Sequence, residues 1–148
     1  MRIIVDGDAC PVKKIIVDIA KQSKLEVIMV SDINHLINDG YSKVITVDQD
    51  ADSADMKIVN IAVKNDLVLT ADYGLASLVL APGLRCMDFN GMEYTSLNID
   101  LLLLQRFTSA KARRSGKKTS GPSKRKNKNN EDFEFKLKTV ISEMINLN

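Results

Sequence analysis

Length, composition and charge describe a chain of one ordinary domain without a membrane-spanning segment. The sequence has 148 residues, 45% of them hydrophobic and 27% charged, which is enough apolar material for a core under a polar surface. No apolar run reaches the roughly 18 residues that a membrane-spanning helix needs, and the N-terminus enters a strand-like run without the pattern of a signal peptide. We therefore expect a cytoplasmic protein.

The net charge of +2 conceals a strong asymmetry along the chain. Residues 1–105 carry 9 Lys/Arg and 15 Asp/Glu, whereas residues 106–130 carry 10 Lys/Arg and no acidic residue. An acidic body with a basic arm is typical of proteins that bind a polyanion.

Strand and helix patterns alternate along residues 1–114. Short apolar and β-branched runs predict five strands, at residues 2–5, 26–30, 42–47, 67–70 and 85–89. Apolar residues at helical spacing predict helices at residues 11–23, 54–62, 73–80 and 99–114. Such alternation favours an α/β domain with three layers, α/β/α, around a mainly parallel five-stranded sheet.

The remainder of the chain is of two kinds. Residues 115–130 are rich in Lys, Arg, Ser, Gly and Asn, and they predict a basic flexible loop. Residues 131–148 predict a C-terminal amphipathic helix whose apolar face must dock on the body or on a second subunit, so a homodimer is one expected arrangement. The residues of that face are Phe133, Leu137, Val140, Ile141 and Met144.

Aspartates follow three of the predicted strands. Asp6 and Asp8 follow the first strand, residues 48–55 hold four more aspartates after the third, and Asp72 follows the fourth. Because the carboxyl ends of parallel strands lie at one edge of a sheet, we expect these carboxylates to converge. Clustered carboxylates repel one another unless a cation or a shared proton relieves them, and Asp suits Mg²⁺ or Mn²⁺.

Simpler roles exist for part of this set. Asp52 is also placed to cap a helix, and Asp55 to complement the positive end of its dipole. Asp48 and Asp50 also fit a solvated loop. Asp6, Asp8 and Asp72 directly end apolar strands, which favours a functional role for them.

Several other site classes lack their sequence patterns. No His or Cys spacing indicates zinc, and neither a phosphate-binding GxxxxGK[ST] loop nor a GxGxxG turn is present. There is no GxSxG, and the single histidine, His35, lies in a polar, turn-rich stretch that favours a surface position. Cys10 and Cys86 predict reduced, partly buried thiols, although the dipole of a helix that starts near Cys10 could lower its pKa.

Four segments carry a resemblance to known proteins: residues 6–11 (DGDACP), 52–55 (DSAD), 69–76 (LTADYGLA) and 98–100 (NID). With them the chain resembles the YaiI/YqxD family of small bacterial proteins over most of its length, and that family in turn resembles the PIN-like nuclease superfamily. Asp6 matches the acid after the first strand of PIN domains, and Asp55 their helix-borne Asp followed by Ile-Ala. The usual intervening Glu is absent, so only Asp48, Asp50 or Asp52 could replace it.

The resemblance implies a metal-dependent nuclease, with RNA as the favoured substrate, that uses Mg²⁺ or Mn²⁺ at the C-terminal edge of the sheet. The implied catalytic residues are Asp6, Asp8, Asp55 and Asp72, and Asp52 joins these four as an implied metal ligand. The basic arm is expected to hold the nucleic acid by its backbone without base stacking, because aromatic residues are scarce in it. The predicted nucleic-acid-binding residues are Arg106, Lys111, Arg113, Arg114, Lys117, Lys118, Lys124, Arg125 and Lys126.

Two rival functions remain open. Asp6-Gly7-Asp8 after an apolar strand also resembles the first motif of the haloacid-dehalogenase phosphatases, with Asp6 as nucleophile, Asp8 as acid/base and Thr70 in their second motif. A Lys and a late pair of Asp in the order of that family are not evident, although Lys57, Lys64 and Asp88 can be offered. The second rival is a non-catalytic RNA-binding module.

Overall fold

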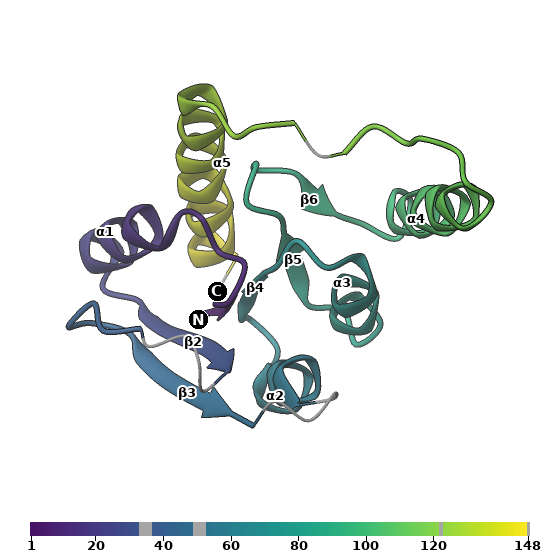
Figure 1. The fold of residues 1–148 in the computed structure, drawn as a ribbon. Helices are drawn as coiled ribbons and strands as arrows, with labels where there is room; N and C mark the ends of the chain where they lie inside the picture. Colours follow the sequence, from purple (N-terminus) through teal and green to yellow (C-terminus); the bar gives the residue numbers. More distant parts are fainter. Residues whose placement is uncertain (33–36, 49–52, 122, 148) are drawn as a thin grey trace.

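The chain forms an α/β fold with a six-stranded, mainly parallel sheet and five helices. The computed structural model describes residues 1–32, 37–48, 53–121 and 123–147 (Figure 1). The strands are β1 (Arg2–Asp6), β2 (Glu26–Asp32), β3 (Lys43–Val47), β4 (Leu67–Leu69), β5 (Arg85–Met87) and β6 (Glu93–Tyr94). The helices are α1 (Lys13–Ser23), α2 (Ser53–Ile61), α3 (Tyr73–Leu80), α4 (Ile99–Arg114) and α5 (Asn127–Asn146).

The strand order across the sheet is β3-β2-β1-β4-β5-β6. The first five strands are parallel, as predicted, and β6 is antiparallel to β5. The prediction of five strands was wrong by one, because β6 has only two residues and shows no pattern of its own. The chain reaches β6 through a turn after β5, in which the Asp88 side chain accepts hydrogen bonds from the backbone N–H groups of Asn90 and Met92, each at 2.8 Å.

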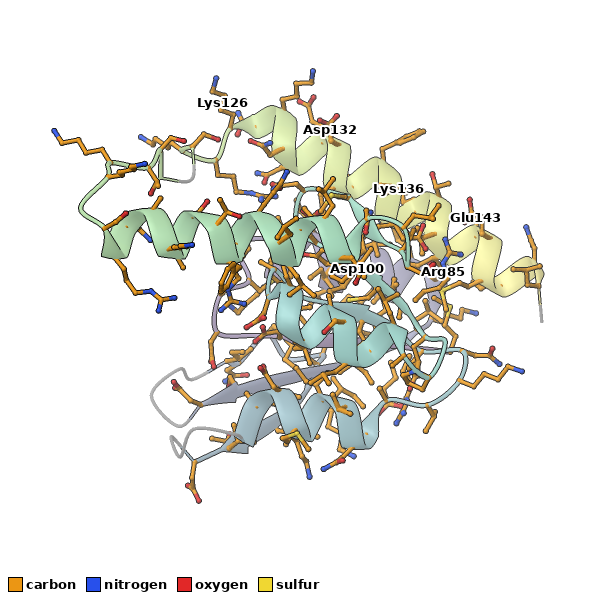
Figure 2. The ribbon with its side chains drawn as sticks, turned by 90° about the vertical axis from the view of Figure 1, so that its right-hand side faces the viewer. Arg85, Asp100, Lys126, Asp132, Lys136 and Glu143 are labelled. Atoms are coloured by element: carbon orange, nitrogen blue, oxygen red, sulfur yellow. The ribbon has the colours of Figure 1, made fainter. Side chains whose placement is uncertain are left out.

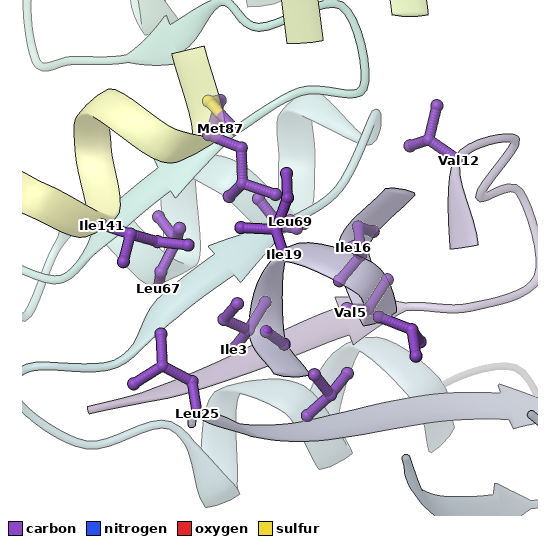
Figure 3. Packing of buried hydrophobic residues seen from close by; sticks show 14 of the residues in the cluster. Ile3, Val5, Val12, Ile16, Ile19, Leu25, Leu67, Leu69, Met87 and Ile141 are labelled. Atoms are coloured by element: carbon purple, nitrogen blue, oxygen red, sulfur yellow. The ribbon is translucent and has the colours of Figure 1, made fainter. Parts of the chain in front are cut away.

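Both faces of the sheet are buried, which explains the continuous apolar runs of its central strands. Ile3 and Val5 of β1 belong to a core cluster with residues of α1 and α5, and Ile4, which points to the opposite face, belongs to a second cluster with residues of α2 and α3. Figure 1 accordingly shows α1 and α5 on one side of the sheet and α2, α3 and α4 on the other. Figure 3 shows part of the first cluster, with Ile141 of α5 close to Leu67.

The C-terminal helix docks on the body of its own chain, which is one of the two arrangements expected. All five residues of its predicted apolar face are buried, with Phe133, Leu137 and Val140 fully so. The helix begins at Asn127, four residues earlier than predicted, and the connection from α4 is correspondingly shorter. Among the described residues, no helix combines the length and the apolar character needed to cross a membrane.

Candidate functional site

The C-terminal ends of β1 and β4 form a switch point in the sheet. These two strands are neighbours, and Val5 pairs with Leu69. The helix that follows β1 packs in one core cluster, whereas the helix that follows β4 packs in the other. In open α/β sheets the following loops diverge at such a point and leave a crevice in which ligands bind.

A shallow pocket of about 360 Å³ lies at this position. Two of the residues that line it, Asp6 and Asp72, are carboxylates that the sequence predicted for the site. Another lining residue, Arg106, is a cation of α4. The full lining consists of Asp6, Ala9, Ala71, Asp72, Tyr73 and Arg106. The pocket therefore brings two negative charges and one positive charge to the edge where the sequence predicted a site.

Asp6 is the last residue of β1, and its carboxylate is held by a neighbouring strand end. The Thr70 hydroxyl, fully buried after β4, donates a hydrogen bond of 2.9 Å to Asp6 Oδ2. Burial raises the pKa of Asp6, the Thr70 hydrogen bond opposes that rise, and the negative charges of Asp55, Asp8 and Asp72 add to it. The charges of three other predicted carboxylates thus act on Asp6.

Asp72 has a structural role that the sequence interpretation did not assign to it. It is the N-cap of α3, and its Oδ1 accepts the backbone N–H groups of Gly74 at 2.8 Å and Leu75 at 3.2 Å. Its own backbone N–H donates to Thr70 Oγ1 at 3.0 Å, and Arg106 Nη1 lies 3.4 Å from Oδ1. The carboxylate is consequently fixed in orientation at the pocket wall.

Asp8 and Asp55 lie beside the pocket and do not line it. Both oxygens of Asp8 accept the backbone N–H of Asp32 at the end of β2, at 3.0 and 3.2 Å. Asp55 lies in the first turn of α2, and its pKa is raised by burial and by the charge of Asp72. Asp52 falls outside the described residues. Within the ranges that the structure describes, no three His, Cys, Asp or Glu side chains are gathered closely enough to enclose a metal ion.

The predicted basic residues are spread over four places. Arg106 lines the pocket, whereas Lys111, Arg113 and Arg114 are exposed on the last turns of α4. Lys117, Lys118 and Lys124 are exposed in the connection to α5, and Lys126 is the N-cap residue of that helix.

Arg125 has contacts of a different kind from the other predicted cations. It donates hydrogen bonds to Phe89 O at 2.6 Å, Asn90 Oδ1 at 2.9 Å and Asn130 Oδ1 at 2.7 Å. Its guanidinium therefore anchors the start of α5 to the turn between β5 and β6.

Thr70 and Cys10 were also missed or misjudged from sequence. Thr70 was considered only for the rival phosphatase, yet it joins Asp6 to Asp72, and its signal was a hydroxyl residue two positions before a strand-end acid. Cys10 is buried three residues before α1 begins, and burial raises the pKa of its thiol to about 11, which is the opposite of a helix-dipole effect.

Comparison with known proteins shows a close set of relatives. The family model described as "Uncharacterized BCR, YaiI/YqxD family" matches residues 4–143. A UPF0178 protein of Ruminiclostridium cellulolyticum is 47% identical over 95% of this chain and 92% of its own, and one of Natranaerobius thermophilus is 44% identical over 97% and 98%. Another, of Clostridium novyi, is 46% identical over 99% and 95%. No solved structure matches the chain. The extent of these matches shows that the chain belongs to the YaiI/YqxD family.

Proposed function

We propose that the protein is a PIN-like, metal-dependent nuclease that hydrolyses phosphodiester bonds, with RNA as the favoured substrate. The observation that carries the proposal is that Asp6, Asp72 and Arg106 line one pocket at the switch point of the sheet. A pocket with two carboxylates for a cation and a guanidinium for a phosphate has the charges that this reaction needs. Strand-end acids on a mainly parallel sheet also agree with the PIN-like resemblance.

The donor set of the pocket fits Mg²⁺ or Mn²⁺. Magnesium commonly takes one or two carboxylates from a protein and completes its shell with water and substrate phosphate oxygens, so a cage of three acidic residues is not required. Among the described residues, Asp6 Oδ1 and Asp72 Oδ2 accept no hydrogen bond, which leaves one oxygen of each carboxylate for a cation. Asp6 and Asp72 would hold the ion, with Asp8 and Asp55 adding negative potential. A bound ion would supply an activated water and polarise the phosphoryl oxygens.

The residues of the chain would orient the substrate around this pair. Thr70 holds Asp6, and the first turn of α3 holds Asp72, so both carboxylates keep their direction without the substrate. Arg106 meets Asp72 at 3.4 Å, a long contact for an exposed ion pair, and its planar guanidinium suits two oxygens of a phosphate. Burial first, and then repulsion from Asp55, Asp8 and Asp72, disfavours the ionised form of Asp6, and a cation in the pocket would relieve that repulsion.

The rival phosphatase is favoured by one contact and opposed by the positions of three residues. Its support is the Thr70 hydroxyl on Asp6, as expected for a first-motif Asp beside a second-motif Thr. Against it, Asp8, the required acid/base, accepts the backbone N–H of Asp32. Lys64 precedes β4 and thus lies at the opposite edge of the sheet from the pocket, while Lys57 is exposed on α2. We therefore favour the nuclease.

The decisive experiment measures metal binding and RNA cleavage in the same variants. Mn²⁺ binding is followed by electron paramagnetic resonance, and cleavage with a labelled single-stranded RNA, with a matched DNA strand beside it. Asp6→Asn and Asp6→Asn/Asp55→Asn should weaken Mn²⁺ binding by at least about tenfold and abolish cleavage. Asp18→Asn, which removes an exposed carboxylate of α1, serves as the matched control and should leave both unchanged.

The other outcomes separate the candidates. Cleavage that persists in the Asp6→Asn/Asp55→Asn variant would overturn the nuclease site. A burst of product from p-nitrophenyl phosphate, with an acyl-phosphate trapped on Asp6, would establish the phosphatase instead. RNA binding without cleavage in Mg²⁺ or Mn²⁺, across several sequences, would leave the non-catalytic module as the function.

A further inference from the structure

The C-terminal half of α4 is an exposed helix that the body of the protein does not cover. Ile99 is its buried residue, and Leu102 and Leu103 pack against the second core cluster, but residues 104–108 are all exposed. In Figure 2, α4 extends well beyond the end of α3. The C-terminal half of α4 therefore needs no apolar side chain to pack against the core of its own chain.

An aromatic residue and two cations nevertheless share one side of that half. Phe107, Lys111 and Arg114 are spaced by four and three residues, which places them on one helix face. Together with Ser115 they line a pocket of about 450 Å³. Phe107 is 61% exposed, whereas Phe133 of α5 is fully buried. The face thus combines an exposed ring with positive charge.

The chemistry of this face suits a single-stranded nucleic acid. Nucleobases stack on exposed aromatic rings regardless of sequence, and Lys and Arg neutralise the phosphates between them. No acidic residue occurs from 101 to 130, so nothing on the arm opposes a polyanion. The same helix carries Arg106, one residue before Phe107, into the pocket of Asp6 and Asp72. A strand that leaves the ring can therefore reach the carboxylates along one helix.

We propose that the C-terminal half of α4 is a binding subsite for single-stranded nucleic acid, in which a base stacks on Phe107 and Lys111 and Arg114 contact the adjacent phosphates. The inference deepens the proposed nuclease and rests on it for the identity of the ligand. It revises the expectation that the basic arm contacts only the backbone, since that expectation rested on the scarcity of aromatic residues in residues 106–130 and not on the position of the one that is present, Phe107.

The test measures binding without metal, so that it is independent of cleavage. The probes are a fluorescein-labelled oligouridylate of about 12 nucleotides, within the usual range of single-strand site sizes, and a duplex of equal length. Phe107→Leu should weaken binding of the single strand by about fivefold or more and change the duplex little. Phe135→Leu, which alters a 74% exposed phenylalanine on α5, is the matched control and should have no effect.

Two further variants separate stacking from charge. The sequence contains no tryptophan, so Phe107→Trp introduces a single reporter whose fluorescence should be quenched when the oligonucleotide is added, while Phe135→Trp should not respond. Lys111→Gln/Arg114→Gln should reduce the slope of log affinity against log salt by about 1.4, and Phe107→Leu should leave that slope unchanged.

Three results would overturn the subsite. The first is an equal loss of single-strand binding in Phe107→Leu and Phe135→Leu, and the second is no binding of the single strand by the unaltered protein. The third is a dimer in sedimentation that Phe107→Leu dissociates, which would assign the face to a second copy of the chain. Failure of the nuclease looks different. If binding depends on Phe107 but no RNA is hydrolysed, the nuclease is refuted and the subsite stands. If Phe107→Leu hydrolyses RNA with an unchanged KM, the nuclease stands and the subsite is refuted.

Discussion

The Asp6 carboxylate is held where its negative charge is unfavourable. Its pKa is raised above the usual value of 3.8 by burial and by the acidic side chains around it. The folded protein therefore binds the Asp6 proton more tightly than the unfolded chain does. Ionisation of Asp6 lowers stability as the pH rises from about 3.8 through the raised pKa, and the loss is complete above it. In the proposed nuclease, this loss of stability accompanies a charge that would bind a cation.

We expect Asp6→Asn to stabilise the protein at neutral pH while it weakens metal binding. The amide oxygen can still accept the Thr70 hydroxyl, and the repulsion is removed, so the gain should lie in the range of single stabilising changes, about 0.5–2 kcal/mol. The gain should shrink as the pH falls through the raised pKa and should vanish below 3.8, where the Asp6 carboxyl is protonated in the folded and in the unfolded state. Urea denaturation of both proteins across this pH range measures it. A variant that is less stable than the parent at neutral pH would contradict this account of the carboxylate.

Sequence reasoning located Asp6 and Asp72 correctly at one sheet edge, because strand ends and parallel pairing follow from local patterns. It could not find the Thr70 bridge or the Arg106 contact. Thr70 reaches Asp6 across 64 residues of chain, and Arg106 reaches Asp72 across 34. Both depend on which strands are neighbours and on where α4 packs, and neither is encoded in residue spacing.

The helix α3 depends on the same carboxylate that faces the pocket. Asp72 accepts two backbone N–H groups at the start of this helix, and α3 packs Leu75, Ala76 and Val79 into the second core cluster. The cap needs only an acceptor oxygen, whereas the metal-binding role that we propose for Asp72 needs a negative charge. Substitutions that differ in these properties can separate the two.

Asp72→Ala should lower the free energy of unfolding by about 1 kcal/mol, whereas Asp72→Asn should change it by only a few tenths, because Asn is an equally good N-cap. Both variants should lose Mn²⁺ binding and RNA cleavage, since neither keeps the charge. Chemical denaturation gives the first quantity and metal titration the second. If Asp72→Asn retained full metal affinity, Asp72 would be a cap alone; if both variants were equally destabilised, the cap would not be the source of the effect.

At the scale of the whole molecule, the fold fixes both ends of the basic arm, residues 106–130. Its first part is the end of α4, and its last part is fastened by Arg125 and by the buried face of α5. The predicted terminal helix is confirmed, because its apolar residues recur at helical spacing. The position of α5 against α1 and β1 was not predictable, since its apolar face fits a second subunit equally well by pattern.

Because the segment between α4 and α5 is fixed at both ends, we expect the positions of its cations, and not only their number, to determine how strongly the protein binds nucleic acid. Replacing Lys117, Lys118 and Lys124 with Gln changes the formal net charge from +2 to −1. If each contacts one phosphate, the slope of log affinity against log salt for a single-stranded RNA should fall by about 2. The same charge is removed by replacing Lys14, Lys21 and Lys24, which lie on or just after α1. This control variant should leave the slope unchanged. An equal fall of the slope in both triple variants would contradict the prediction, because it would show that the ligand is attracted by net charge and does not contact the segment that joins α4 to α5.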